Sequence, residues 1–92
     1  LYRVWAAMKQ RCTNPRNKDW PFYGDRGIRV CQEWCESYTA FRDWSLANGY
    51  KDGLEIDRQD NSGHYEPANC RWVTHQKNSQ NRRSRWRHRL KK

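Results

Sequence analysis

The sequence has no apolar run that approaches the roughly 20 residues needed to cross a membrane. It also has no segment with the charged start, apolar centre and small-residue cleavage site of a secretory signal peptide. These absences exclude a membrane-spanning helix in this chain. We therefore expect a soluble, intracellular protein whose partners do not include a membrane.

The cysteines lack the paired C-x-x-C spacing that makes a zinc site a strong prediction. They are Cys12, Cys31, Cys35 and Cys70, and the only close pair is separated by three residues. Three of them follow apolar runs, as buried thiols do. The sequence leaves three alternatives open: a structural zinc site that could include His64 or His75, inert core cysteines, or a disulfide.

Acidic side chains are absent from residues 67–92, which carry nine basic ones. Residues 1–30 carry seven basic and two acidic side chains, whereas residues 31–66 carry three basic and eight acidic ones. The net charge of +9 therefore comes from two basic flanks around an acidic centre. This distribution suits a protein that contacts DNA phosphates at both ends and holds a divalent cation between them, although a solvated basic surface has the same composition.

The chain is short enough to form one domain, and 92 residues bury only about 60 to 65% of their unfolded surface. Six Trp, five Tyr and two Phe can fill that small core with large rings. Apolar residues at three- and four-residue spacing predict one helix from Leu1 to Cys12 and another, with Trp34 on its apolar stripe, that begins near Ser37. Asn48 and the glycine after it predict the end of the second helix. Residues 28–31 are predicted to form a short strand.

The stretch from Leu54 to Asn81 has the pattern of a hairpin followed by a helix. Residues 54–58 alternate with the period of a strand, residues 60–63 supply turn chemistry, and residues 70–73 form a second strand-like run. Thr74 can cap a helix from His75 to Arg83, a segment without Gly or Pro. The expected fold class is therefore α+β: a small single domain whose hairpin and helix pack on two further helices.

This stretch resembles the ββα-metal core of HNH (His-Me finger) nucleases, especially those of phages and homing endonucleases. Such motifs place an Asp and then a His at the end of the first strand, an Asn at the head of the second, and an Asn or His on the helix. Here Asp57, Asn69 and Asn78 stand at three of the four positions, and Arg58 replaces the general-base His. The residues from Tyr23 to Thr74 also resemble a phage-associated group, through the sequence pattern YG-x-RGI-x-VC…DR-x-DN-x-G-x-Y-x-P-x-NCRW-x-T. The resemblance runs from Tyr23 to Asn81 and implies a bacterial cytoplasm or phage-infected cell as its location.

The resemblance implies a divalent metal, Mg²⁺ or Mn²⁺, held by the hard oxygen atoms of Asp57 and Asn78. In the family the Asn at the position of Asn69 orients the general base. Arg58 cannot accept a proton, because a guanidinium stays charged, but it could hold a phosphate or stabilise charge in the transition state. The structural alternative is that Asp57 and Asn69 only cap the hairpin and that Asn78 is a polar helix residue.

Other groups could act as the base in place of the missing imidazole. The candidates are His64 in the hairpin loop, His75 at the start of the helix, Tyr65, or a metal-bound hydroxide. Spacing alone does not choose among them.

Two functions from different classes follow. One is a metal-dependent HNH-like DNA endonuclease, and the other is a catalytically inactive DNA-binding module on the same scaffold. We divide the chain into residues 1–53, which pack on the core, residues 54–83, the HNH-like core, and residues 84–92, a basic tail that supplies non-specific affinity. The predicted DNA contacts are Arg16, Lys18, Arg26, Arg71, Arg82, Arg83, Arg85, Trp86, Arg87 and Arg89.

Overall fold

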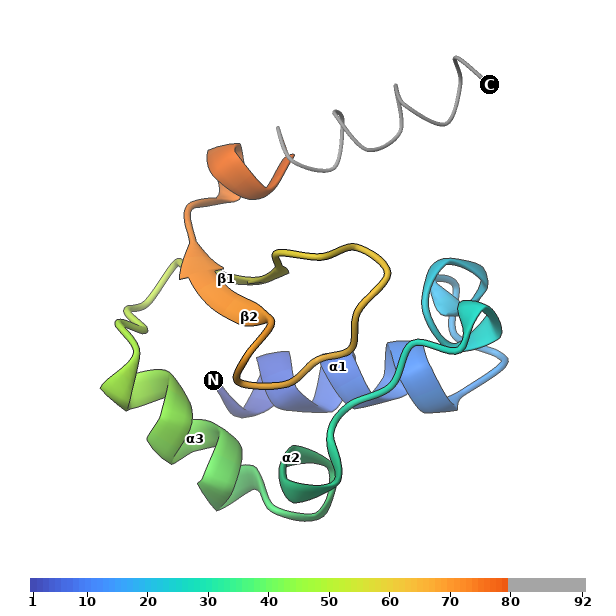
Figure 1. The fold of residues 1–92 in the computed structure, drawn as a ribbon, viewed down its shortest axis with the longest axis horizontal. Helices are drawn as coiled ribbons and strands as arrows, with labels where there is room; N and C mark the ends of the chain where they lie inside the picture. Colours follow the sequence, from blue (N-terminus) through green and yellow to red (C-terminus); the bar gives the residue numbers. More distant parts are fainter. Residues whose placement is uncertain (80–92) are drawn as a thin grey trace.

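A computed structural model describes residues 1–79 of the chain (Figure 1). Its elements, in order, are helix α1 (Tyr2–Thr13), the 3-10 turns η1 (Trp20–Phe22) and η2 (Gly24–Arg26), helices α2 (Gln32–Glu36) and α3 (Tyr38–Ala47), and strands β1 (Glu55–Arg58) and β2 (Cys70–Val73). Residues 75–79 are helical as well. The fold is a single α+β domain, as the sequence predicts.

Helices α1 and α3 confirm the two predictions from apolar spacing. Met8 and Cys12 of α1 are buried at the spacing of one helical turn. Helix α3 begins where Ser37 accepts a hydrogen bond on its Oγ from the Ala40 backbone N–H at 3.1 Å, and it ends at Asn48. Gly49 follows with φ of +88°, a conformation that glycine adopts without strain.

The predicted strand at residues 28–31 is wrong. Val30 forms only an isolated parallel bridge with Tyr65. Two backbone bonds make this bridge, from Cys31 N to Tyr65 O at 2.8 Å and from Tyr65 N to Arg29 O at 2.9 Å. The segment cannot extend the pairing, because α2 begins at the residue after Cys31. Trp34 lies on this short α2 and not on α3, since Ser37 is extended and separates the two helices.

Strands β1 and β2 form an antiparallel pair in which Asp57 is opposite Arg71 and Arg58 is opposite Cys70. Side chains of directly opposed residues point to the same side of a sheet, and side chains of adjacent residues point to opposite sides. One side, which we name the core face, therefore carries Ile56, Arg58, Cys70 and Trp72. The other side, which we name the helix face, carries Glu55, Asp57, Arg71 and Val73.

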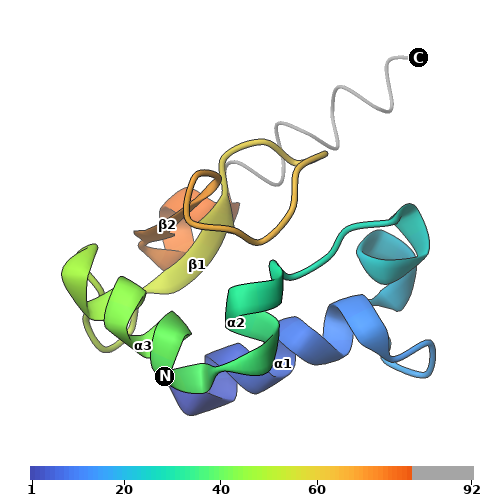
Figure 2. The same ribbon diagram turned by 60° about the horizontal axis from the view of Figure 1, so that its bottom comes forward.

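Aromatic rings attach the core face to the helical layer. The Trp72 ring lies 6.0 Å from Phe41 and 6.5 Å from Trp44, both on α3, and 4.7 Å from Tyr50. Phe41 in turn meets the fully buried Trp34 edge-on at 5.0 Å. Figures 1 and 2 show the hairpin against the layer formed by α1, α2 and α3, with the helical residues 75–79 on the other side of the hairpin. No helix in residues 1–79 is long and apolar enough to cross a membrane.

Candidate functional site

The helical residues 75–79 pack on the helix face of the hairpin. Thr74 ends the strand and caps this helix as predicted, since its Oγ1 accepts a hydrogen bond from Lys77 N at 3.3 Å and its carbonyl accepts one from Asn78 N at 3.0 Å. Because only one residue separates β2 from the helix, the helix must fold back over the strand that precedes it. The hairpin and helix thus adopt the ββα order that the sequence predicts.

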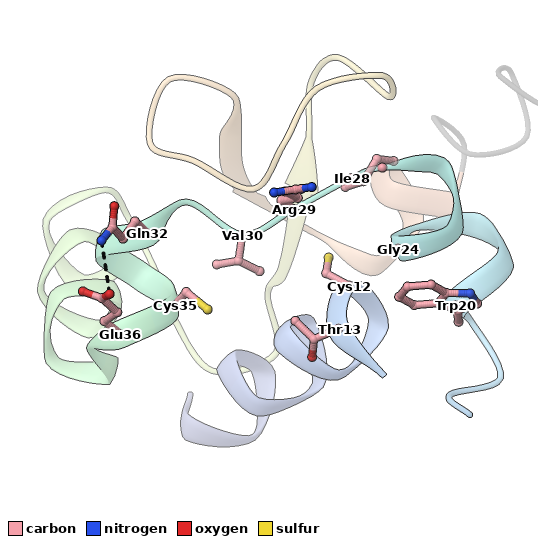
Figure 3. Close-up of a pocket in the computed structure, with 11 residues that line it drawn as sticks. Cys12, Thr13, Trp20, Gly24, Ile28, Arg29, Val30, Gln32, Cys35 and Glu36 are labelled. Carbon is pink, nitrogen blue, oxygen red and sulfur yellow. Dashed lines mark hydrogen bonds between the residues drawn. The ribbon is translucent and has the colours of Figure 1, made fainter. Parts of the chain in front are cut away.

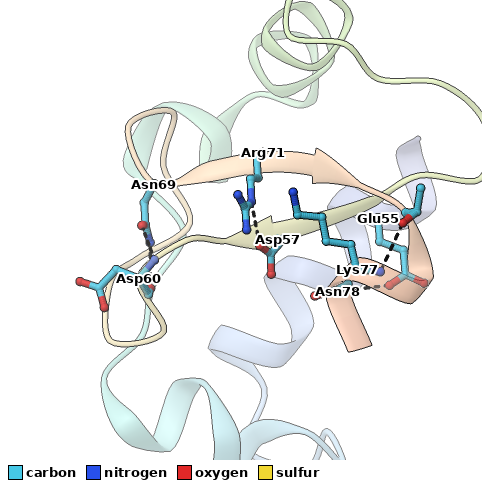
Figure 4. A network of polar contacts seen from close by, with 8 residues as sticks. Glu55, Asp57, Asp60, Asn69, Arg71, Lys77 and Asn78 are labelled. Carbon is cyan, nitrogen blue, oxygen red and sulfur yellow. Dashed lines mark hydrogen bonds and ion pairs between the residues drawn. The ribbon is translucent and has the colours of Figure 1, made fainter. Parts of the chain in front are cut away.

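Glu55 joins the helix to the hairpin. Its Oε1 accepts a hydrogen bond from Asn78 Nδ2 at 2.7 Å, and its Oε2 lies 2.7 Å from His75 Nδ1 (Figure 4). Asn78 is buried, at 5% exposure. Glu55 is a site residue that our sequence reasoning missed, although its position two residues before Asp57 places it on the same side of the strand.

Asp57 forms an ion pair with Arg71 across the two strands. Arg71 Nε lies 3.1 Å from Asp57 Oδ2, and the side chains are 36% and 1% exposed respectively. A carboxylate that leaves water needs a cation or several donors close to it, because an isolated buried charge is costly. Arg71 is therefore held through Nε by the predicted metal ligand, while its side chain remains partly exposed. Lys77, also missed from sequence, extends along the same side (Figure 4).

Arg58 points to the core face, away from Asp57. Its Nη1 donates to the carbonyls of Asn61 and Gly63, both at 2.8 Å, and its Nη2 donates to Asn61 Oδ1 at 3.3 Å. The guanidinium lies over the rings of Tyr23 and Tyr65, at 5.1 and 5.2 Å from their centroids. Arg58 thus closes the loop between the strands and is only 6% exposed. In this position it has the contacts of a structural residue.

Asn69 also holds the loop closed. Its Oδ1 accepts a hydrogen bond from Asp60 N at 2.9 Å, and its Nδ2 donates to the carbonyls of Asp60 at 3.1 Å and His64 at 3.0 Å. A Cβ at Gly63 would lie 2.6 Å from Asn69 Nδ2, so only glycine permits this approach. Asn69, which stands at the predicted orienting position, therefore holds the backbone of the loop in place. This is the role it has in the structural alternative, in which it only caps the hairpin.

The three side chains proposed as bases differ in their contacts. His64 Nδ1 accepts a hydrogen bond from Arg29 N at 2.9 Å, which attaches the loop to the segment before α2. Tyr65 is buried and accepts a hydrogen bond on its hydroxyl from Arg11 Nη2 at 3.1 Å. Burial raises the pKa of Tyr65 to about 12, so its phenol remains protonated at neutral pH. Of the three side chains, only His75 contacts a residue of the helix face.

The four cysteines are free thiols: Cys12 is on α1, Cys31 and Cys35 lie one turn apart at the start of α2 and on it, and Cys70 begins β2. Cys12 and Cys35 line a pocket of about 650 Å³ between α1, η2 and α2, together with Trp20, Val30 and Arg29 (Figure 3). Burial raises the pKa of Cys12 to about 11 and that of Cys70 to about 12, which favours the thiol over the thiolate that binds zinc. In the described part of the chain, no three His, Cys, Asp or Glu side chains are grouped so that they could hold a metal. The arrangement is that of the core-cysteine alternative.

The predicted DNA contacts are spread over two parts of the molecule. Arg16 and Lys18 are exposed in the loop after α1. Arg26 is exposed too, but its guanidinium donates to Phe22 O at 3.1 Å and Asn61 O at 3.3 Å, which joins η2 to the hairpin loop. Arg71 lies on the helix face. The remaining predicted contacts, Arg82, Arg83, Arg85, Trp86, Arg87 and Arg89, lie outside the described residues.

The HNH resemblance implies a divalent metal at Asp57 and Asn78, and the arrangement of these side chains does not fit one. Asp57 Oδ2 already lies 3.1 Å from the charged guanidinium of Arg71. Asn78 presents its amide nitrogen to Glu55. A metal at the carboxylate would lie close to a permanent positive charge, and like charges at such distances repel strongly where solvent is scarce.

Comparisons with known proteins add no family assignment: no protein-family model matches the chain, and neither a curated protein nor a solved structure matches it significantly.

Proposed function

We propose that this protein is a DNA-binding module built on an HNH-like hairpin and helix, and that it binds through the phosphate backbone. The observation that carries the proposal is the position of Arg58. The residue that replaces the general base of the resembling motif points to the core face and closes a loop through three hydrogen bonds. Arg58 therefore has a structural role that does not depend on cleavage. The basic residues expected to contact DNA are present in the same chain.

Charge supports the same proposal. Residues 80–92 carry seven of the nineteen basic side chains and no acidic one. In the sequence they follow directly on residues 75–79, the helical residues that pack on the hairpin. Lys and Arg at this density neutralise DNA phosphates and release condensed counterions, which gives sequence-independent affinity.

The proposal is tested by titrating the full chain against duplex DNA at several salt concentrations. A matched variant replaces Arg82, Arg83, Arg85 and Arg87 with Gln. Each phosphate contact contributes about 0.9 to the salt slope, so loss of four should lower the slope by about 3 to 4. A wild-type protein that does not bind duplex DNA even at low salt would contradict the proposal.

Metal-dependent cleavage, the other function that the motif predicts, stays a prediction. It is checked by incubating supercoiled plasmid with the protein and Mg²⁺ or Mn²⁺, beside Asp57→Ala and Asn78→Ala. Nicking by the wild type that both variants lose would establish the nuclease. The same plasmid left uncut, but bound, agrees with the module.

A further inference from the structure

The Asp57–Arg71 pair lies where the resembling motif would hold its metal. The carboxylate is 1% exposed and the arginine 36%, so the pair has a buried acidic end and a basic end at the surface. The cross-strand register fixes both residues on a rigid element. The position expected to attract a cation therefore contains one that is covalently part of the chain.

A guanidinium can bind a carboxylate and a phosphate at the same time, because it carries five N–H donors in a planar fork. In Arg71 the Nε–H is directed to Asp57 at 3.1 Å. The contact with Asp57 uses only Nε, and the arginine side chain as a whole is 36% exposed, so the Nη donors of the fork are the groups suited to a phosphate. Holding Nε limits the rotamers of the arginine, so less entropy is lost when a phosphate binds.

Lys77 provides a second cation, on the helical residues that pack on the helix face. It is exposed on the helical residues 75–79 and extends along the helix face toward the arginine (Figure 4). Thr74 fixes its position by capping the turn through Lys77 N at 3.3 Å. Together, Arg71 and Lys77 place positive charge where a nucleic-acid phosphate can approach.

We infer that Arg71 takes the place of the metal: it contacts a DNA phosphate directly, and this face binds DNA without a divalent cation. The inference rests on the proposed DNA-binding function and names one residue that performs it. Asp57 is then a positioning residue that acts through Arg71. It has no metal to hold.

The experiment measures the affinity of the full chain for a fluorescent duplex in EDTA and again in millimolar Mg²⁺, for the wild type and for Arg71→Gln. Arg42→Gln is the matched control, because Arg42 also pairs with an aspartate, Asp43 at 3.2 Å, but lies on α3 and not on the helix face. We expect the wild type to bind in EDTA at least as tightly as in Mg²⁺, because added Mg²⁺ only competes for the phosphates. Arg71→Gln should weaken binding roughly tenfold and lower the salt slope by about 0.9 relative to Arg42→Gln.

Asp57→Asn separates this inference from a metal site, and it remains informative if Arg71→Gln fails to fold. Asparagine can still accept a hydrogen bond from Nε but carries no charge to hold the guanidinium, so we expect Asp57→Asn to bind DNA in EDTA less tightly than the wild type and more tightly than Arg71→Gln. We also expect Mn²⁺ not to shift the melting temperature of the wild type but to raise that of folded Arg71→Gln, whose carboxylate has lost its guanidinium.

The outcomes distinguish the two proposals. Wild-type protein that binds no DNA in either buffer overturns both. Binding that requires Mg²⁺, or is lost in Asp57→Asn, overturns the inference and leaves the DNA-binding function intact. Equal affinities for Arg71→Gln and Arg42→Gln also overturn the inference, since Arg71 would then serve only the fold.

Discussion

Arg58 and Arg71 lie on opposite faces of the same two-stranded sheet, and their surroundings give them different roles. Arg58, on the core face, is 6% exposed and donates three hydrogen bonds to groups in one loop. Arg71, on the helix face, has a side chain that is 36% exposed and pairs with a carboxylate. The first is enclosed by the protein, whereas the second is partly exposed to solvent.

The difference shows that two arginines on one two-stranded sheet can have different roles, according to which face each one lies on. Arg58, which stands at the position of the base in the resembling motif, closes the loop, and its charge lies against the rings of Tyr23 and Tyr65. The arginine opposite the predicted metal ligand supplies positive charge at the surface. The variants below test whether the two arginines differ as this comparison requires.

The largest effect is expected for Arg58→Met. The change removes the Arg58 donor from the carbonyl of Gly63, removes one of two donors from the carbonyl of Asn61, and removes the cation from the two rings. We therefore expect the free energy of unfolding to fall by about 3 kcal/mol. Urea denaturation measures this. The folded variant should bind DNA with an affinity close to that of the wild type. A loss of stability below about 1 kcal/mol would show that Arg58 does not have the structural role described above.

Arg71→Gln should destabilise the protein less than Arg58→Met but more than Asp57→Asn. Loss of the guanidinium deprives a carboxylate that is 1% exposed of a cationic partner, at about 2 kcal/mol after allowance for the exposure of Arg71. Asparagine at 57 can still accept from Nε, so about 1 kcal/mol is expected. Urea midpoints of the two variants give the order, and the reverse order would show that Arg71 does little to stabilise Asp57.

Alkaline pH should lower the stability of the protein through its two buried thiols. Burial raises the pKa of Cys12 to about 11 and of Cys70 to about 12, so in the unfolded chain these thiols lose protons at a lower pH than in the native protein. Stability should therefore fall as pH rises from about 9, by somewhat less than 1.4 kcal/mol per unit for each thiol. Urea midpoints from pH 7 to 10 measure the slope, and Cys12→Ala with Cys70→Ala should flatten it.

The smallest effect is expected for His75→Ala. The imidazole is 78% exposed, so its contact with Glu55 at 2.7 Å is screened by water and should contribute about 0.5 kcal/mol. Glu55 keeps its bond from Asn78, and the helix should remain packed. A loss above about 2 kcal/mol would show that His75 holds the helix on the hairpin.

Local patterns in the sequence predicted much of the fold. The apolar spacing of α1, the Ser37 and Thr74 caps and the alternation of residues 54–58 depend on neighbours a few residues away, and each is found in the structure as predicted. The strand expected at residues 28–31 failed because pairing depends on a distant partner, and Tyr65 supplies only one bridge. The three alternatives for the cysteines stayed open in the sequence for a related reason, since their spacing does not reveal which elements meet.

The roles of the two arginines required the tertiary structure. Alternation along a strand shows that Asp57 and Arg58 point to opposite sides, but not which side meets the helical layer. That choice follows from the rings around Trp72 and from the single residue between β2 and the following helix. The sequence by itself determined a basic α+β chain with a hairpin and helix at residues 54–79. Only the packing placed Arg58 among buried carbonyls and Arg71 beside a buried carboxylate, because burial depends on what covers each face.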